Sequence, residues 1–387
     1  MVQLAVARRL VAVTRVPSLA LTRILWYFAL TRLTLFIVAA IATRFPTRAP
    51  PPPEVYLPKN LAGWVRWDAG WYLSVVERGY WFDPQGQSNV AFFPLFPLLI
   101  KGVAFLVGPP VVAGLIVANV AALGAVVAFW AWVRAEAGPE AAESAVRWLL
   151  VFPFSFFFHS IYGESVFFLL VALAFLAAGR QRWPAAGLCG GFAAATRPIG
   201  ILLFPAFAWG LWRAWRDGRK PGVVEALSVL LVPAGLGAYV VYLWAEFGSP
   251  LAFWHAHAVG WGVLQLHENL AWYWRDVHSI FTRGPRIHTP AHLLDTLRIV
   301  LPLVFIGLTI QVFRRLGPVP GLYTGLAVLV SILFAPESVG RELLTAIPAF
   351  AAAGMMDRSS TGEGVRMLSM GLLLIFLFAF VRGRFVG

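Results

Sequence analysis

The chain has 387 residues, of which 59% are hydrophobic and only 13% are charged. Soluble domains carry about a quarter charged residues, so this composition excludes an ordinary soluble protein and predicts a polytopic membrane protein. The 31 Lys and Arg residues outnumber the 18 Asp and Glu residues, which gives a formal charge of +13. Most of the arginines fall at the ends of apolar runs, where cytoplasmic loops collect positive charge. Membrane topology explains this excess better than nucleic acid does, and we expect no nucleic-acid partner.

The N-terminal segment 1–23 is basic and contains no acid. The apolar run that follows, 24–42, is long enough to span a bilayer and too long for the apolar region of a signal peptide. We therefore expect residues 1–23 to lie in the cytoplasm and residues 24–387 to form a single membrane domain that begins with a retained helix.

The remaining apolar runs predict an all-α protein with about eleven membrane helices, within a range of about ten to twelve. Their expected ranges are 22–43, 108–134, 146–161, 164–179, 183–197, 198–215, 222–246, 297–313, 318–336, 342–357 and 366–382. Several are shorter than the ~20 residues that a perpendicular span needs, so we expect tilted or broken helices. The segment 91–107 is also apolar, but Pro94, Pro97 and Lys101 favour a re-entrant or interfacial helix.

The arginines set the orientation of these helices. With the N-terminus inside, the inner loops hold Arg134, Arg147, Arg180, Arg182, Arg213, Arg216, Arg219, Lys220, Arg314, Arg315, Arg358 and Arg366. This distribution agrees with the positive-inside bias, although Arg382 and Arg384 then lie outside against it. Two long loops, 44–107 and 247–296, also lie outside, and loops of this length usually carry function.

Asp68 lies in the first outer loop, between Trp67 and Trp71. If this segment is helical, one face of the helix carries Asp68, Tyr72, Val75 and Gly79. This spacing predicts a short amphipathic helix in the outer interface, with its indoles at headgroup depth. The carboxylate then lies just above the hydrocarbon, where the reactive end of a lipid phosphate would be. An interfacial helix with one solvated acid is the alternative interpretation.

Four motifs resemble those of the GPI mannosyltransferase II (PIG-V) family and its bacterial relatives. In chain order they are Arg66-Trp67-Asp68-Ala69 with Gly79-Tyr80, Ala91-Phe92-Phe93-Pro94 and Pro97; Tyr162-Gly163-Glu164-Ser165; Thr196-Arg197-Pro198-Ile199-Gly200; and Arg341 followed by Pro348. In the third motif Pro198 and Ile199 replace the Ser-Asn pair of the family. The resemblance is clear over residues 60–205 and faint afterwards, and all four motifs fall on the same predicted side of the membrane.

The resemblance implies a glycosyltransferase of the GT-C fold that moves a hexose, typically mannose, from a polyprenyl-phosphate sugar to its acceptor. The acid of the family's first outer loop maps onto Asp68, which would be the catalytic base for the acceptor hydroxyl. A phosphate leaving group departs without protonation where cations compensate its charge, so one base with nearby cations suffices for an inverting transfer. The candidate cations for the donor phosphate are Arg66, Arg197, Arg341 and Lys101, with snorkelling helix-end side chains as the alternative interpretation.

The candidate residues for the acceptor or the sugar are Glu164, Tyr162, Trp67, Trp71, His255 and His257. Indole faces stack on sugar rings, and imidazoles contact phosphate. The alternatives are a solvated turn acid for Glu164 and an interfacial aromatic segment for the second outer loop. His255, His257 and His267 match no zinc spacing. We therefore expect no cofactor, with a metal left open.

The expected partners are a polyprenyl-phosphate sugar donor, a lipid or glycan acceptor, and membrane lipids. Short loops and an Ala- and Arg-rich composition indicate the plasma membrane of a prokaryote with an extracytoplasmic site, or the ER membrane in a eukaryote. Two other functions stay open. A lipid-linked sugar flippase or transporter is expected to show repeat symmetry and polar residues at mid-membrane. A non-catalytic subunit of a glycan-assembly complex would not need Asp68.

Overall fold

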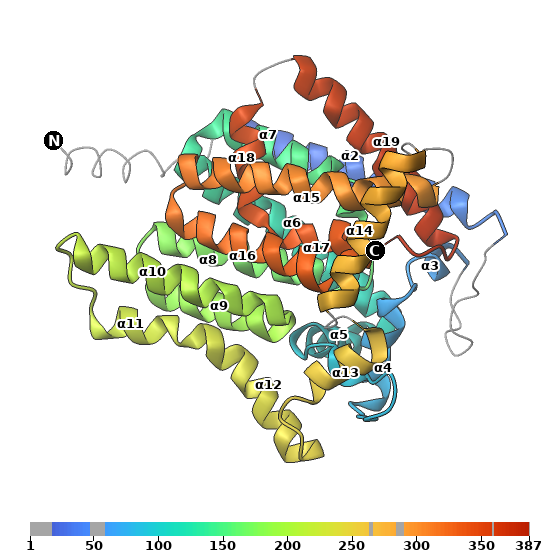
Figure 1. Cartoon of the computed structure of the whole chain (residues 1–387), viewed down its shortest axis with the longest axis horizontal. Helices are drawn as coiled ribbons and strands as arrows, with labels where there is room; N and C mark the ends of the chain where they lie inside the picture. Colours follow the sequence, from blue (N-terminus) through green and yellow to red (C-terminus); the bar gives the residue numbers. More distant parts are fainter. Residues whose placement is uncertain (1–17, 47–58, 263–265, 284–289, 358–359, 387) are drawn as a thin grey trace.

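The computed structural model describes residues 18–46, 59–262, 266–283, 290–357 and 360–386. Within these residues the regular elements are all α-helices and short 3-10 helices, which confirms the predicted all-α class (Figure 1). Most of the predicted cytoplasmic segment 1–23 lies outside the described residues, as does Arg358.

The N-terminal half contains helices close to most of the predicted ranges. They are α2 (Ser18–Ala42), α3 (Lys59–Ala62), α4 (Asp68–Arg78), η1 (Asn89–Ala91), α5 (Leu95–Val107), α6 (Pro110–Ala137), α7 (Pro139–Val151), η2 (Ser155–Phe158), α8 (Glu164–Gly179) and α9 (Trp183–Thr196). The helix predicted over 146–161 is wrong. Helix α7 ends at Val151, because Pro153 disfavours the helical conformation at Phe152, which is extended with ψ 136°.

The C-terminal half is more irregular than the apolar runs predict. Its elements are η3 (Pro198–Leu202), α10 (Leu203–Arg216), α11 (Val223–Val229), α12 (Leu231–Phe247), α13 (Ala252–Trp261), α14 (Leu266–Arg283), α15 (Pro290–Arg315), α16 (Pro318–Phe334), η4 (Pro336–Ser338), α17 (Val339–Glu342), η5 (Leu343–Thr345), α18 (Ile347–Met356) and α19 (Ser360–Val381). The single helix predicted over 342–357 is also wrong. The chain from Pro336 to Thr345 turns by 116° from α16, and α18 begins after it.

Fewer helices are long enough to cross a membrane than the eleven that the sequence predicts. Among the described residues, four helices are long and apolar enough to cross a membrane, and two bent pairs raise the number to six. Helices α5, α8 and α18 are apolar but shorter. The count of eleven therefore stays a prediction that depends on tilted and broken helices.

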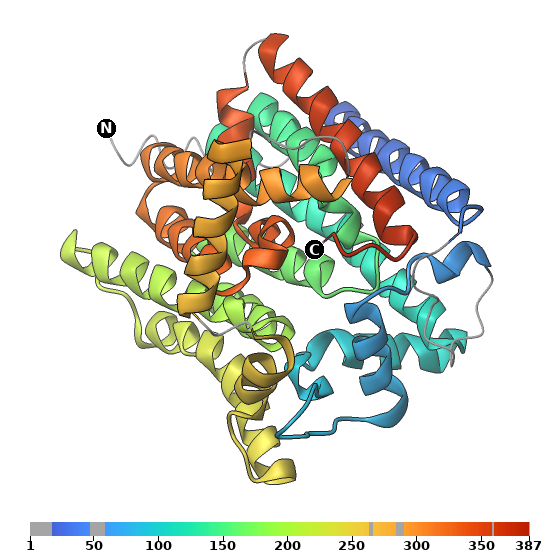
Figure 2. The same ribbon diagram turned by 45° about the vertical axis from the view of Figure 1, so that its right-hand side comes forward.

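Close helix contacts hold the bundle together. A Cβ added at Gly187 would lie 1.8 Å from the Ser228 carbonyl oxygen, and one at Gly235 would lie 1.9 Å from that of Gly191. These glycines let α9 approach α11 and α12 at backbone distance, as small residues do between membrane helices. The last helix, α19 in red, runs beside the first, α2 in blue (Figure 2).

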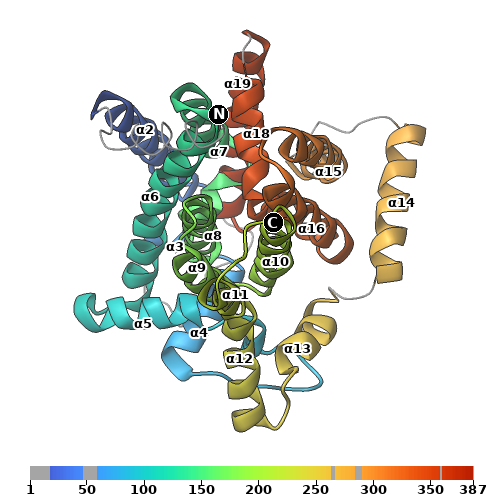
Figure 3. The ribbon, with the colours of Figure 1, turned by 90° about the vertical axis from the view of Figure 1, so that its left-hand side faces the viewer.

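The first and second predicted outer loops meet at one end of the bundle. Helices α4, α5 and α13 lie together there, and α5 crosses the end of α6 (Figure 3). Helix α5 exposes Leu98, Phe105 and Leu106, with Phe105 90% exposed. Exposed apolar side chains on a separate short helix agree with the interfacial helix that the sequence predicts for 91–107.

Candidate active site

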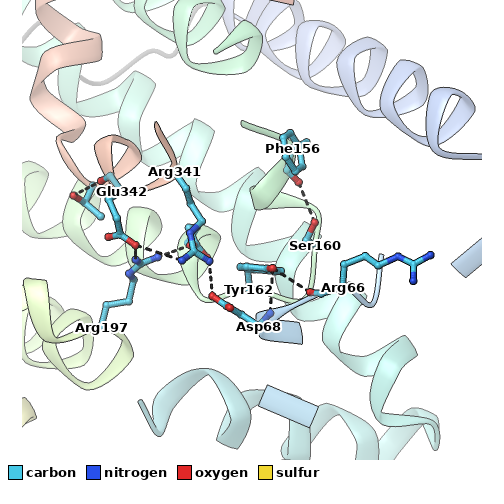
Figure 4. Close-up of polar contacts among 10 residues, drawn as sticks. Arg66, Asp68, Phe156, Ser160, Tyr162, Arg197, Arg341 and Glu342 are labelled. Carbon is cyan, nitrogen blue, oxygen red and sulfur yellow. Dashed lines mark hydrogen bonds and ion pairs between the residues drawn. The ribbon is translucent and has the colours of Figure 1, made fainter. Parts of the chain in front are cut away.

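Five charged side chains from four separate segments meet in one cluster. Figure 4 shows Asp68, Arg197, Arg341 and Glu342. The members of this charged cluster are Asp68, Glu164, Arg197, Arg341 and Glu342. Each comes from a helix end or an irregular joint, so their meeting depends on the breaks in the bundle. The sequence predicts four of the five and places them on the same side of the membrane.

The two arginines link the three acids. Arg197 pairs with Glu164 through Nη1 and with Glu342 through Nη2, at 2.5 Å in each case. Arg341 pairs with Asp68 through Nη1. The Arg341 Nε and Nη2 atoms lie 3.7 Å from the Glu164 and Glu342 carboxylates, respectively. Arg341 therefore lies between Asp68 and the two glutamates.

Burial divides the three acids. The Glu164 side chain is 2% exposed and that of Glu342 is 15% exposed, whereas the Asp68 side chain is 24% exposed. The Glu164 Oε2 atom is buried without a hydrogen bond. Three carboxylates share two guanidinium groups, so the acids of the charged cluster outnumber its cations, and the Arg341 Nε atom is likewise buried without a hydrogen bond. Asp68 is the acid of this cluster that an outside molecule reaches most easily.

Local backbone structure positions these acids and bases. Asp68 and Glu164 are the first residues of α4 and α8, where the helix dipole stabilises negative charge. Arg197 is extended, with φ −150° and ψ 138°, because Pro198 follows it. A Cβ at Gly200 would lie 2.5 Å from the Ala194 amide nitrogen, so only glycine lets this turn pack on the end of α9.

Tyr162 contacts the backbone on both sides of Trp67. The Tyr162 hydroxyl donates to the Arg66 carbonyl oxygen at 3.0 Å and accepts from the Asp68 amide at 3.2 Å. Burial and the Asp68 charge raise the pKa of Tyr162 well above its ordinary value, so the hydroxyl keeps its proton and donates. Between these two contacts Trp67 has φ 52°, which L side chains rarely adopt.

The two outer loops together form an aromatic cluster at α4. Trp71 stacks on Phe92 with ring centroids 5.9 Å apart, and Trp261 of α13 packs edge-on against Trp71 at 5.4 Å. His257 Nδ1 donates to the Phe253 carbonyl at 2.8 Å. Burial lowers the pKa of His257, although the Phe253 carbonyl and the Asp68 and Glu342 charges oppose this shift.

Several predicted site residues lie away from the charged cluster. The Arg66 guanidinium points away from Asp68 (Figure 4) and donates to the Val381 carbonyl from Nε and Nη2, at 3.1 and 2.9 Å. Lys101 is exposed on α5. His255 contacts the Pro84 carbonyl at 2.8 Å. Trp67 packs edge-on against Phe385.

Glu342 is the member of the charged cluster that the sequence prediction missed. It directly follows Arg341 in an otherwise apolar segment, and this pair of adjacent charges was the available signal. No local signal pointed to the contact between Arg66 and Val381, because the two residues are 315 positions apart.

The sequence leaves metal binding at this site open. Within the described part of the chain, no group of three or more His, Cys, Asp or Glu side chains is arranged to hold a metal ion. The three carboxylates of the charged cluster are instead directed at guanidinium groups. The expectation that no cofactor is used stays a prediction.

A family comparison supports the sequence resemblance. Residues 19–205 match the sequence model of the family described as Mannosyltransferase (PIG-V). The matched range contains Asp68, Glu164 and Arg197. No curated protein sequence matches the chain.

Solved structures with a similar fold are membrane glycosyltransferases. ArnT from Cupriavidus metallidurans bound to undecaprenyl phosphate matches with a TM-score of 0.54 and 16% identity, over 91% of this chain and 63% of ArnT. An oligosaccharyltransferase from Archaeoglobus fulgidus in complex with Zn and sulfate matches with a TM-score of 0.51 and 12% identity, over 91% of this chain and 53% of that chain. The chain thus spans less than two thirds of the length of either neighbour.

These comparisons define the fold. The chain has the GT-C fold of membrane glycosyltransferases, which confirms the predicted fold class. Within this fold, residues 19–205 are similar in sequence to the mannosyltransferase (PIG-V) family.

Proposed function

We propose that this protein is an inverting mannosyltransferase that moves a hexose from a polyprenyl-phosphate sugar to a lipid or glycan acceptor. The observation that carries the proposal is the Asp68–Arg341 ion pair at the exposed edge of the charged cluster. A base is thereby next to a cation that binds phosphate well, in a chain whose first half matches a mannosyltransferase family.

Asp68 is the proposed general base. It takes the proton from the acceptor hydroxyl while the hydroxyl oxygen forms a bond to the anomeric carbon of the sugar. The bond between that carbon and the phosphate oxygen breaks, and the polyprenyl phosphate leaves with its electron pair. A single displacement inverts the anomeric carbon, and it needs no second carboxylate as a covalent nucleophile.

Arg341 and Arg197 are the proposed ligands of the donor phosphate. They are the two cations of the charged cluster, and a planar guanidinium binds phosphate through paired hydrogen bonds. A donor phosphate would compete with Asp68 for Arg341. Once Arg341 turns to the phosphate, Asp68 loses its ion pair and becomes a stronger base, so donor binding prepares the base for the acceptor.

The remaining residues of the site have proposed roles around the sugar. Trp71 and its aromatic neighbours offer a flat apolar surface, on which sugar rings stack. Glu342, Glu164 and neutral His257 offer hydrogen bonds to sugar hydroxyls or to the acceptor.

We place this chemistry on the extracytoplasmic side of a prokaryotic plasma membrane, or in the ER membrane if the source is eukaryotic. The placement rests on the arginines in the opposite loops. The bound undecaprenyl phosphate of the structurally similar ArnT supports a donor carried on a polyprenyl phosphate.

The test is a transfer assay with purified protein, polyprenyl-phosphate mannose and a mixture of membrane lipid acceptors. The proposal expects mannose in the product with inverted anomeric configuration. Movement of labelled donor across a vesicle bilayer without transfer would instead favour the flippase or transporter. Neither transfer nor lipid movement by the isolated protein, with transfer restored only in a larger complex, would favour the non-catalytic subunit.

A further inference from the structure

The backbone just before Asp68 is strained. Trp67 precedes the first residue of α4 and has φ 52° and ψ −115°, with no side-chain hydrogen bond at this helix start. For a residue as bulky as tryptophan this conformation is an outlier, and such residues persist only where the surroundings hold them. Strain beside a reactive side chain is a known way to fix its direction.

Contacts on both sides of Trp67 oppose its relaxation. The Tyr162 hydroxyl joins the Arg66 carbonyl to the Asp68 amide, so it spans the strained residue. The Arg66 side chain donates two hydrogen bonds to the Val381 carbonyl at the end of α19. The Trp67 indole packs against Phe385, with ring centroids 5.3 Å apart.

Tyr162 and Arg66 are buried, whereas Asp68 is partly exposed. Tyr162 is 2% exposed and Arg66 is 5% exposed, whereas the Asp68 side chain is 24% exposed. Both hydrogen bonds of the Tyr162 hydroxyl go to backbone atoms. The Tyr162 hydroxyl and the Arg66 Nε and Nη2 atoms therefore contact backbone atoms, next to the turn that carries Asp68.

We propose that Tyr162 and Arg66 are positioning residues that clamp the strained Trp67 turn and so aim the Asp68 carboxylate at the acceptor hydroxyl. This inference rests on the proposed role of Asp68 as the base. The sequence predicts Tyr162 as an acceptor ligand and Arg66 as a ligand of the donor phosphate. In this proposal both residues instead hold the backbone at Trp67. Release of either contact lets residue 67 return to negative φ, which moves the carboxylate from its productive position.

The experiment compares Tyr162→Phe in the wild-type chain and in a Trp67→Gly chain. Glycine adopts positive φ without strain, so it keeps the turn without the tyrosine hydroxyl. Because a misplacement of about 1 Å can cost on the order of 10²-fold in rate, we expect Tyr162→Phe alone to lower kcat by ten- to a hundredfold. Its donor KM stays unchanged. In the Trp67→Gly chain the same substitution lowers kcat by less than about threefold, because the clamp no longer has strain to oppose.

Two further variants separate positioning from other roles. Arg66→Gln is expected to lower kcat at an unchanged donor KM, whereas a phosphate ligand would raise the donor KM when replaced. Tyr239→Phe is the matched control, since its buried hydroxyl donates to the Val90 carbonyl at 2.8 Å and has no contact with the Trp67 turn. We expect Tyr239→Phe to leave kcat unchanged.

A raised donor or acceptor KM for Tyr162→Phe, or an equal kcat loss in both chains, overturns the clamp. If the wild-type protein transfers no sugar, the proposed function fails, and an experimental structure of Tyr162→Phe still decides this inference. The clamp requires residue 67 to move to negative φ in that variant. A φ that stays near its wild-type value contradicts it.

Discussion

Two polar clusters flank α18 in the chain, and they differ in how fully their acids are satisfied. The charged cluster lies before α18 and contains Arg341 and Glu342. The second, here called the Asp357 cluster, follows α18 and consists of Asp357, Arg366, Ser144 and Trp148. Both join segments that are far apart in the sequence.

The Asp357 cluster is closed. The Asp357 Oδ2 atom accepts from Ser144 Oγ at 2.6 Å and from Trp148 Nε1 at 3.2 Å, and it pairs with Arg366. Its side chain is 5% exposed. One acid with several protein donors ties α7, α18 and α19 together.

The charged cluster is open by comparison. It has more carboxylates than guanidinium groups, a Glu164 oxygen without a hydrogen bond, and a partly exposed Asp68. Both clusters contain an ion pair, so an ion pair alone does not indicate a reactive site. What distinguishes the candidate active site is an excess of acids over cations and an acid, Asp68, at an accessible edge.

The largest effect is expected for Asp68→Asn. Loss of a general base lowers rates by about 10²–10⁴-fold, so we expect sugar transfer to fall within this range. Stability should change little, because Arg341 keeps Glu164 and Glu342 as partners. Steady-state transfer and thermal unfolding in detergent check both statements. Asp83→Asn, in the same outer loop and also exposed, is the control and should transfer normally.

Arg341→Lys tests whether the charged cluster binds the donor phosphate. The substitution keeps the positive charge but loses the planar donor fork, so we expect kcat/KM for the donor to fall about ten- to a hundredfold. Arg216→Lys replaces an exposed arginine that pairs with Asp217, and it should have no effect on transfer. An unchanged kcat/KM for Arg341→Lys would remove Arg341 from the donor site.

Asp357→Asn tests the Asp357 cluster. It weakens charge-assisted hydrogen bonds from Ser144 and Trp148 as well as the pair with Arg366, so we expect a loss of about 1–3 kcal/mol in stability. The kcat of the folded fraction should equal that of the wild type. A large fall in kcat with unchanged thermal stability would mean that the two clusters do not differ as described.

The smallest effect concerns His257 and pH. Burial lowers the pKa of His257 in the folded protein below the unfolded value of about 6.5, so the unfolded chain binds more protons in that range. Its contribution to stability is complete above pH ~6.5 and is lost as pH falls from there towards the folded pKa. Asp68, Glu342 and Arg197 are the charged groups around it. The unfolding temperature measured from pH 7.5 to 5 should therefore fall less in His257→Asn than in the wild type or in the exposed control His255→Asn.

Local sequence signals predicted the parts of the fold that depend on them. Helix α8 begins at Glu164 and ends at Gly179, as the apolar run between a Gly-Glu turn and Arg180 indicates. The predictions failed where proline and tertiary packing break an apolar run, as at Pro153 and between Pro336 and Thr345. Hydrophobicity alone does not distinguish a straight span from a broken one.

The candidate site also has features that the sequence predicted and features that it did not. Asp68, Glu164, Arg197 and Arg341 carried motif signals, and the structure brings them together. The direction of a side chain carried no signal: the sequence places Arg66 two residues from Asp68, but its guanidinium binds the far end of the chain. The positive φ of Trp67 was equally invisible, because the Tyr162 hydroxyl that spans this residue comes from a distant part of the sequence.

The most direct test of the account is the dissociation constant of polyprenyl-phosphate mannose for Asp68→Asn and for the wild type. Asp68 is proposed to act on the acceptor hydroxyl and Arg341 to bind the donor phosphate, and Asp68 competes with that phosphate for Arg341. Asp68→Asn should therefore bind the donor as tightly as the wild type or more tightly, while its rate of sugar transfer falls about 10²–10⁴-fold. A loss of donor binding in proportion to the loss of transfer would show that Asp68 holds the donor, and it would contradict the assignment of Asp68 as the base.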